Sequence, residues 1–403
     1  MSALSSSIGI VESVQEQLRE RHDMTGNGHD KTQQILDRAV AELDIPGIAI
    51  EVKNADGSWF GTAGVSDLTT GAPRVPGEFL PIGSGAKGIT AATLLTLEAE
   101  GRVDLEDPVN KWLPGVLTHG YDGDRITIRH LLGNTSGLFA TGLAPGLIGN
   151  YASRSTFDEH RFDEWTREEL LKLAVSEPPV GQPGERFQYA NGGFYIANAI
   201  IEKITGNTYA EEIQRVVIQP LGLTNTYPRS GGDTGYRGPS PRAYSTQFYK
   251  DGVDPADVTT ENWESMFEEP GLAPLDVTEF NTSWETGNIV STTSDAIRLL
   301  DALAGGTLLP PGQHRKMWTT VSTAGSGWLP HTRYGLGMFE LDKAVTGGLT
   351  IRGMAGSYWG HMFFALSSPD SGVAFAFHTN TEAKNWDVPF NIAEAEFGFT
   401  MSA

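Results

Sequence analysis

Residues 81–90 read Pro81-Ile82-Gly83-Ser84-Gly85-Ala86-Lys87-Gly88-Ile89-Thr90 and contain the only S-x-x-K tetrad of the chain. The apolar run that follows, residues 88–100, has the pattern of a buried helix and stops at Gly101, a residue typical of helix ends. A Ser in the first turn and a Lys three residues later lie on one helix face, close enough to touch. The tetrad therefore predicts a serine nucleophile near the positive helix end, beside a lysine that burial can turn into a base.

A second segment, residues 183–193, reads PGERFQYANGG and places Tyr189 and Asn191 in front of the helical run FYIANAIIEKITG. A Tyr beside a Lys can relay protons, and an Asn amide can orient both the Lys and a substrate. The plain alternative is an aromatic packing residue at a helix start. By itself this segment favours that alternative, so its meaning depends on the tetrad.

A third segment, residues 352–361, reads RGMAGSYWGH and is rich in glycine. Glycines let one backbone approach another or a ligand closely, which is a common need where amides must point at an oxyanion. The plain alternative is a strand bend marked by glycine. As with the second segment, the functional interpretation gains weight only from the other two.

Together the three segments resemble the family of class C β-lactamases, serine D-Ala-D-Ala carboxypeptidases, D-aminopeptidases, D-amino-acid amidases and related carboxylesterases. S-x-x-K is a signature of penicillin-recognising enzymes, and Y-x-N as the second element indicates the class C side. The resemblance runs from about Leu36 to the C-terminus. It includes further short matches at 45–47, 101–109, 113–114, 126–132, 135–138, 219–226, 287–292 and 334–337.

The resemblance implies a role for each matching residue. Ser84 would be the nucleophile, Lys87 its base partner, and Tyr189 the general base and acid. Asn191 would bind the acyl part of the substrate. The oxyanion hole would consist of the backbone N–H groups of Ser84 and of Ser357, the residue after Gly356; one such donor is typically worth about 3–4 kcal/mol.

The chain departs from the family at Met354, where relatives usually carry a Lys or His that pairs with a substrate carboxylate. Met offers only a weak acceptor sulfur. Arg352 lies two residues earlier and would share a strand face with Met354, so it is a candidate replacement for the missing charge. We therefore group Arg352 and Met354 with the substrate-binding residues. A second departure, Gly133-Asn134 in place of Thr-His, is interpreted as structural.

The composition is that of a soluble enzyme without a cofactor. The chain has 403 residues, of which 39% are hydrophobic, and a net charge of −21. That charge argues against nucleic-acid partners and anionic membranes. With no Cys, disulfides, thiolate catalysis and Cys-based metal sites are excluded. The first residues lack the basic and apolar regions of a signal peptide, so we expect a cytoplasmic protein with an amphipathic N-terminal helix, although a removed leader would leave the same sequence. The oligomeric state is left open.

The order of elements predicts an α/β fold of the β-lactamase/DD-peptidase type. Strands expected at 47–53, 58–65, 335–341, 349–353, 359–366 and 373–380 would form one antiparallel sheet from both chain ends. Helices would flank this sheet. The predicted organisation is an N-terminal extension (1–29), an α/β lobe (30–85 plus 286–403) and an inserted helix-rich lobe (86–285).

Two long irregular segments, 138–165 and 228–284, are too long for plain connections. The second is too aromatic for a disordered region, and we expect a substrate wall. The acidic cluster around His160 lacks the spacing of a metal site, so we interpret it as a solvated surface and expect no metal. The absence of G-x-S-x-G excludes the α/β-hydrolase interpretation.

The leading functional hypothesis is a serine hydrolase that forms an acyl-enzyme on Ser84 from a small ester, an amide or a short peptide. D-amino-acid amides, D-aminoacyl peptides and carboxylic esters are the expected substrates. A transacylase would use the same intermediate. A β-lactamase or DD-carboxypeptidase is a further alternative, which Met354 disfavours. An inactive binding protein of the same fold is the remaining one, which the joint presence of Ser84, Lys87, Tyr189 and Asn191 disfavours.

Overall fold

The computed structural model describes residues 28–401 apart from 152, 230–231, 251, 255–256, 258–261, 269–272, 282–287 and 383–385. The helix expected in the N-terminal extension lies outside these residues. Within them, no helix combines the length and the apolar character that a membrane crossing requires.

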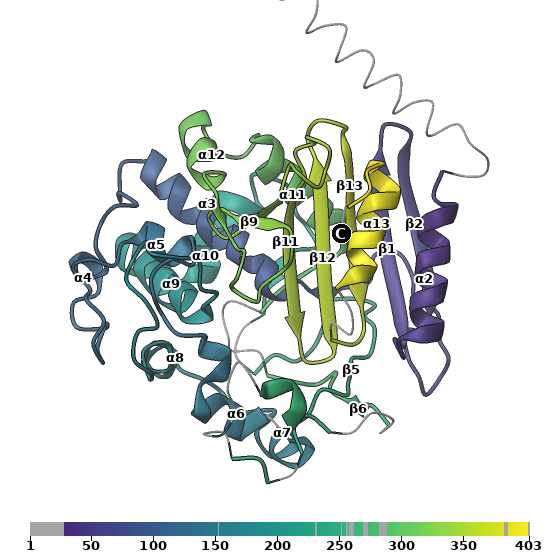
Figure 1. Ribbon diagram of the computed structural model, residues 1–403, viewed down its shortest axis with the longest axis horizontal. Coiled ribbons are helices and arrows are strands. Elements are labelled where there is room, and N and C mark those ends of the chain that lie inside the picture. The colour runs from purple at the N-terminus through teal and green to yellow at the C-terminus, as the bar shows by residue number, and fades with distance from the viewer. Residues whose placement is uncertain are drawn as a thin grey trace, which may run out of the picture.

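A large antiparallel sheet forms the centre of the molecule (Figure 1). In the described residues it has eight strands in the order β2-β1-β13-β12-β11-β10-β9-β8. Their bounds are β1 (Gly47–Asn54), β2 (Gly57–Gly64), β8 (Val321–Ser322), β9 (Thr332–Tyr334), β10 (Phe339–Leu341), β11 (Arg352–Tyr358), β12 (His361–Ser368) and β13 (Val373–Thr379). The pairing of β1 with β13 joins the two ends of the chain, as predicted.

Strand β11 differs from the sequence prediction. It begins at Arg352 rather than at residue 349, and it continues to Tyr358 because Tyr358 still pairs with His361 of β12. Gly356 and Ser357 therefore lie inside a strand and not in a bend. This placement aims their backbone groups in a fixed direction, which matters for the site described below.

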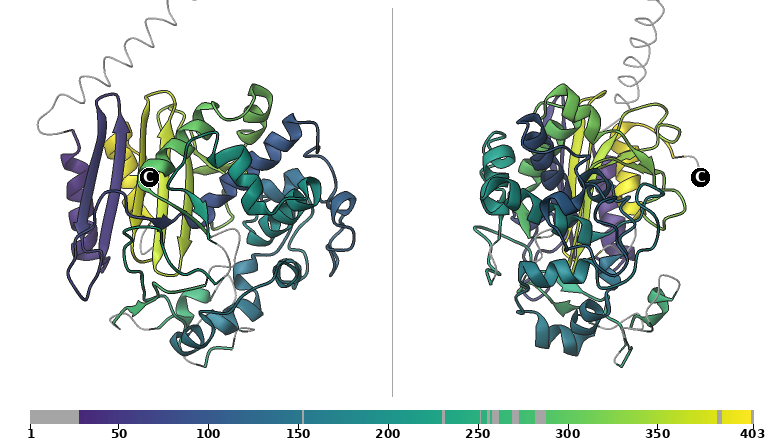
Figure 2. Two further views of the ribbon diagram at one scale, coloured as in Figure 1. Left: turned by 180° about the vertical axis from the view of Figure 1, so that it is seen from behind. Right: turned by 90° about the vertical axis from the view of Figure 1, so that its left-hand side faces the viewer.

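Helices cover both faces of the sheet, as the two views in Figure 2 also show. On one face lie α2 (Asp30–Glu42) and α13 (Asp387–Phe397), which pack against each other and against the strands. On the other lies α11 (Thr293–Gly305), against β12 and β13. Strand β12 serves both layers because its side chains alternate: Phe364 joins the cluster with α2 and α13, and Phe363 joins the cluster with α11.

A helix-rich region packs beside the sheet and is centred on α3 (Ala86–Ala99) and α9 (Asn191–Thr205). Both helices have almost continuous buried runs, which places them in the interior of the region. Around them lie α4 (Val109–Trp112), α5 (Ile128–Leu132), α8 (Arg167–Ala174), α10 (Tyr209–Ile213), a π-helical turn (Gln214–Ile218) and α12 (Pro311–Met317). A small sheet of β3 (Leu80–Pro81), β7 (Ile289–Ser291) and β4 (Tyr227–Pro228) leads into the turn before α3.

The two segments expected to be irregular contain short elements and pack on each other. The first holds α6 (Pro145–Tyr151) and α7 (Arg154–His160), and the second holds β5 (Tyr244–Ser245) and β6 (Leu275–Asp276). They share a separate apolar cluster that includes Tyr151, Phe157, Phe248 and Phe280. We call this part of the molecule the lid region; α6 and α7 lie low in Figure 1, next to β5 and β6.

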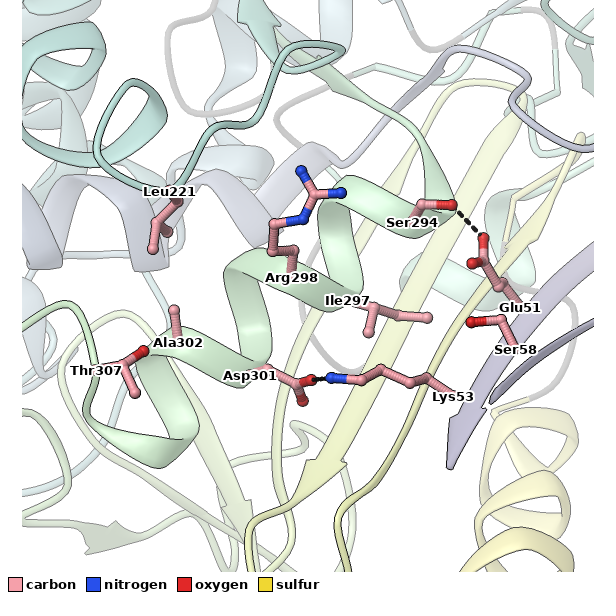
Figure 3. Close-up of a pocket in the computed structure, with 10 residues that line it drawn as sticks. All are labelled: Glu51, Lys53, Ser58, Leu221, Ser294, Ile297, Arg298, Asp301, Ala302 and Thr307. Atoms are coloured by element: carbon pink, nitrogen blue, oxygen red, sulfur yellow. Dashed lines mark hydrogen bonds and ion pairs between the residues drawn. The ribbon is translucent and has the colours of Figure 1, made fainter. Parts of the chain in front are cut away.

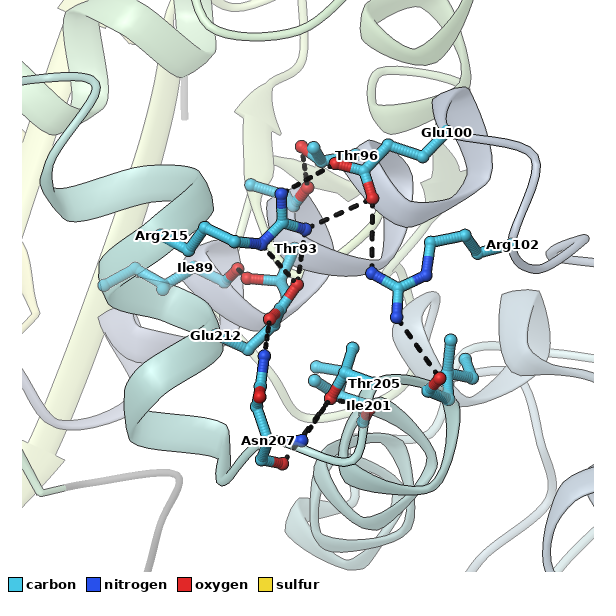
Figure 4. Close-up of polar contacts among 12 residues, drawn as sticks. Ile89, Thr93, Thr96, Glu100, Arg102, Ile201, Thr205, Asn207, Glu212 and Arg215 are labelled. Carbon is cyan, nitrogen blue, oxygen red and sulfur yellow. Dashed lines mark hydrogen bonds and ion pairs between the residues drawn. The ribbon is translucent and has the colours of Figure 1, made fainter.

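A polar network ties the far end of α3 to α10 (Figure 4). Glu212 is fully buried and contacts Arg215 at 2.6 Å, while Asn207 donates to its second oxygen at 3.0 Å. Arg215 also reaches Glu100 at 2.9 Å. Burial acts to raise the pKa of Glu212, but the hydrogen bonds from Arg215 and Asn207 prevail and the pKa lies below its ordinary value.

Replacing Arg215 by Ala should destabilise the protein, because it leaves the buried Glu212 carboxylate without its cation. Arg215 is 44% exposed, so solvent screening limits the expected loss to about 1–2 kcal/mol of unfolding free energy at neutral pH. The difference from wild type should shrink as the pH falls from the ordinary pKa of a glutamate, about 4.3, through the lowered pKa of folded Glu212, because the carboxyl is then protonated in both proteins.

Denaturant unfolding at several pH values measures this difference. Lys172→Ala is the control: the Lys172–Glu168 pair is exposed on both sides, and its loss should leave the midpoint unchanged. Equal effects of the two substitutions would contradict the interpretation.

Candidate active site

Ser84 lies in η1 (Gly83–Gly85), a 3-10 helix of one turn that runs directly into α3. Lys87 belongs to the first turn of α3, so its side chain returns to Ser84, and Nζ donates to Ser84 Oγ at 2.8 Å. Ser84 is half-buried, whereas Lys87 is only 1% exposed. The proximity predicted from the S-x-x-K spacing is therefore present.

Lys87 is surrounded by groups that do not carry charge. Its Nζ also donates to Asn191 Oδ1 at 2.7 Å, and it lies over the rings of Tyr189 and Phe194 at 4.9 and 5.3 Å from their centroids. Burial lowers the pKa of Lys87 to about 7. A substantial fraction of the lysine is therefore the free amine at neutral pH, the form that can accept the serine proton.

Tyr189 comes directly before α9 and faces the same serine. Burial raises the pKa of Tyr189 well above its ordinary value, and a hydrogen bond with Ser84 only partly offsets this. The phenol therefore keeps its proton in the resting protein. The side-chain carbonyl oxygen of Asn191 accepts the hydrogen bond from Lys87. The N–H groups of the same amide therefore remain to contact a substrate.

The turn at Ser84 touches β11 at Gly356. A Cβ on Gly356 would lie 2.3 Å from Ile82 O and 2.6 Å from Ser84 N, so no side chain fits there. Gly83 has a φ of 49°, and a Cβ on it would lie 3.3 Å from Gly356 Cα. These two glycines bring the backbones of Ser84 and Ser357 together, as an oxyanion hole requires.

The edge of β11 that faces away from β12 is open beside Ser84. Strand β10 pairs only with Arg352 and Gly353 of β11. Among the described strands, none pairs with this edge from Met354 onward. Ser357 is exposed, so its surroundings are accessible to a substrate.

Arg352, the candidate replacement for the missing cation, is engaged by other residues. Its guanidinium approaches Glu340 at 3.5 Å, donates to the carbonyl of Ala304 and lies over the Trp318 ring at 4.2 Å. These partners hold it near the ends of α11 and α12, away from Ser84. Packing against Trp318 and Glu340 fixes the direction of Arg352, so the structure gives no contact that favours Arg352 as the replacement for the missing cation.

Met354 is 2% exposed and packs in the apolar cluster that contains Ile82 and Phe363. The expectation that its side chain contacts the substrate is not supported. Its buried side chain instead places an apolar group at the position where the family resemblance implies a cation.

Asn134 has a role that the sequence interpretation missed. It is 1% exposed, has a φ of 53°, and its Oδ1 accepts from the N–H of Ala190 at 3.0 Å. Its carbonyl accepts from the N–H of Gln188 at 2.8 Å. Asn134 thus holds the backbone on both sides of Tyr189. Its departure from the family pattern was the available signal, but only the fold shows what it holds.

The lid region is attached at two points of the site. Thr141 Oγ1 accepts from the N–H of Gly192, next to Asn191, at 3.0 Å. Trp359, which follows β11, packs against Tyr151 and Phe280 of the lid cluster at 5.6 and 5.5 Å between ring centroids. The proposed substrate wall is thereby linked to both the Y-x-N and the glycine-rich segments.

A separate cavity of about 490 Å³ contains none of these residues. It is lined by α11 together with Glu51, Lys53 and Ser58 of β1 and β2 (Figure 3). Within it, Lys53 pairs with Asp301 at 2.5 Å, and Glu51 accepts a hydrogen bond from Ser294 at 2.6 Å. Arg298, which also lines the cavity, pairs with Asp295 at 3.3 Å.

A serine held against a buried lysine, with a phenol and a glycine-lined strand edge beside it, defines a serine hydrolase. The family model described as Beta-lactamase matches residues 32–396, and the chain belongs to that family.

Named relatives of the chain include an esterase, an amidohydrolase and an amidase. The chain is 25% identical to "Esterase EstB" of Burkholderia gladioli, over 89% of this chain and 92% of that one. A D-stereospecific amidohydrolase from Streptomyces sp. has 33% identity and a TM-score of 0.78, with coverage of 92% and 98%. A D-amino acid amidase from Ochrobactrum anthropi SV3 shares the fold at 22% identity and a TM-score of 0.74, with coverage of 92% and 99%.

Gly356→Ala should reduce kcat/KM by about 10²-fold, because the added methyl group forces β11 away from Ser84 and misplaces the oxyanion donors. Steady-state kinetics, with circular dichroism to verify folding, measures the effect. Gly305→Ala is the matched control, since a Cβ there meets nothing within 4 Å. Full activity of Gly356→Ala would show that the close approach is not required.

Asn134→Gly should lower kcat at least tenfold with little change in KM, because glycine keeps the backbone conformation but removes the acceptor that holds Ala190. The control is His119→Gly, which replaces an exposed residue with the same φ of 53°. An Asn134→Gly variant with unchanged kcat would contradict a role in holding Tyr189.

Proposed function

We propose that the protein hydrolyses neutral or ammonium-bearing esters or amides through an acyl-enzyme on Ser84. The observation that carries this proposal is the 2.8 Å contact between Ser84 Oγ and a lysine that burial makes a base. Lys87 takes the serine proton as Oγ attacks the carbonyl carbon, and the N–H groups of Ser84 and Ser357 receive the oxyanion. Tyr189 gives its proton to the leaving atom, and water completes hydrolysis by the reverse proton path.

The substrate class follows from charge. Met354 is apolar and Arg352 is held elsewhere, so neither residue supplies a cation for a carboxylate next to the scissile bond. This favours D-amino-acid amides, D-aminoacyl peptides or simple esters over β-lactams and D-Ala-D-Ala peptides. The names of two relatives, a D-stereospecific amidohydrolase and an esterase, support the same range.

Acyl transfer is the second candidate. A structural neighbour with 20% identity is described as "EstCE1, a hydrolase with promiscuous acyltransferase activity". The exposed position of Ser357 at the open edge of β11 leaves the acyl-enzyme accessible to an alcohol or amine as well as to water. Product analysis in the presence of an added alcohol separates the two outcomes.

Intact-mass spectrometry tests the central proposal. Incubation with an ethyl ester, a D-phenylalanine amide, a D-Ala-D-Ala peptide and a penicillin should add the acyl mass to the wild type from the first two substrates. The two carboxylate-bearing substrates should react about ten- to a hundredfold more slowly. Ser84→Ala should accept no acyl group. An adduct that persists in Ser84→Ala would refute the assignment of the nucleophile.

The acid limb of the pH profile should report Lys87. The free amine is the active form, so kcat/KM for acylation should fall about tenfold per pH unit below about pH 7 and level off above it. If Tyr189 phenolate were the base, the rate would keep rising beyond pH 10, because burial raises the pKa of Tyr189.

Lys87→Arg provides the control, since a guanidinium stays protonated throughout this range. This variant should lose at least about 10²-fold in kcat/KM and should no longer show the limb near pH 7. A limb that survives the substitution would belong to another group.

A further inference from the structure

Trp328 lies against the proton donor of the site. It belongs to the connection between β8 and β9 and stacks on the Tyr189 ring, with 5.7 Å between centroids and 14° between planes. Lys87 also lies over the Tyr189 ring, with its Nζ 4.9 Å from the centroid. Trp328 is half-buried, so part of the indole stays accessible.

The indole is held firmly from behind. Phe187, Tyr334 and Phe339 surround it at 5.2–5.7 Å between centroids, the latter two edge-on. The connection itself is closed by hydrogen bonds: Thr323 Oγ1 donates to Thr332 O at 2.7 Å, and Ser326 Oγ donates to Thr323 O at 2.6 Å. Trp328 is therefore a preformed wall of the site.

The position of Tyr189, the proton donor, identifies which half of the substrate lies next to Trp328. As Ser84 Oγ bonds to the acyl carbon, the bond from that carbon to the leaving oxygen or nitrogen breaks. The Ser84 proton goes to Lys87, and the Tyr189 proton goes to the leaving atom. Lys87 then returns its proton to Tyr189, and the alcohol or amine departs neutral. The leaving group must therefore sit beside Tyr189, and its substituent reaches Trp328.

The cations near this wall are engaged elsewhere. Arg333, on β9, donates to the side chain and the carbonyl of Thr320 at 3.0 Å each. Arg352 is held by Glu340 and Trp318. Lys87 is occupied by Ser84 and Asn191. The accessible surface beside Tyr189 is thus aromatic, which suits an apolar substituent and not a carboxylate.

We propose that Trp328 forms a leaving-group subsite that selects alcohols and amines with uncharged aromatic or bulky apolar substituents. This inference rests on the proposed acyl-enzyme on Ser84 and extends it to the departing half of the substrate. Trp328 is a specificity-determining residue in this assignment, while the bond-making steps belong to Ser84, Lys87 and Tyr189.

Three esters of one acid test the subsite: ethyl, benzyl and 4-carboxybenzyl. They give the same acyl-enzyme, so their kcat/KM values compare acylation alone. Wild type should prefer benzyl to ethyl and should discriminate against 4-carboxybenzyl. Trp328→Ala should lower the benzyl-to-ethyl ratio about five- to tenfold, and Trp328→Phe should retain most of it. Trp318→Ala, at the half-buried Trp beside Arg352, is the matched control and should leave the ratio unchanged.

Loss of the same factor for ethyl and benzyl esters in Trp328→Ala would overturn the proposal, because it would show that the indole only supports Tyr189. Should that variant fail to fold, Trp328→Leu replaces it, and an unchanged ratio there overturns the proposal too. The proposed function fails differently: wild type would then form no acyl-enzyme on Ser84 from any of the three esters by intact mass.

Discussion

The close approach of β11 to the turn before α3 is the constraint on which the rest of the structure depends. Gly356 meets the backbone of Ile82 and Ser84 at distances that exclude even a methyl group. That contact joins the large sheet, assembled from both chain ends, to the first helix of the helix-rich region. It also sets the directions of the backbone N–H groups of Ser84 and Ser357. Sheet, helix and oxyanion geometry are therefore fixed by one backbone contact.

The chemistry at this junction depends on the absence of charge around Lys87. An acidic neighbour would keep the lysine protonated, whereas the described contacts of its Nζ are a hydroxyl, an amide oxygen and two aromatic rings. The same surroundings keep Tyr189 protonated. Burial thus shifts the two pKa values in opposite directions, which suits Lys87 to accept a proton and Tyr189 to donate one.

Local patterns in the sequence were sufficient for the helix after Ser84, for the contact of Ser84 with Lys87 and for the strands at both chain ends. The approach of Tyr189 and Asn191 to these two residues was predicted from the resemblance to a family, because it joins segments about a hundred residues apart. The direction of Arg352 could not be predicted, since it depends on Glu340 and Trp318 from other elements. Asn134 was interpreted as structural, but what it holds could not be predicted for the same reason: its partners lie more than fifty residues away. The helices α6 and α7 were missed because they are short and packed mainly within the lid region.

Lys87 also has a thermodynamic consequence for the whole fold. The unfolded chain holds this proton up to about pH 10.4, whereas the folded chain releases it near pH 7. Folding stability therefore rises with pH between those values, and below about pH 7 the fold carries a penalty of roughly 5 kcal/mol. An uncharged side chain of similar length, such as Met, would remove that penalty together with the base. A chain with a lysine at this buried position is thus less stable than the same fold with an uncharged side chain there, and selection for heat resistance alone would work against Lys87.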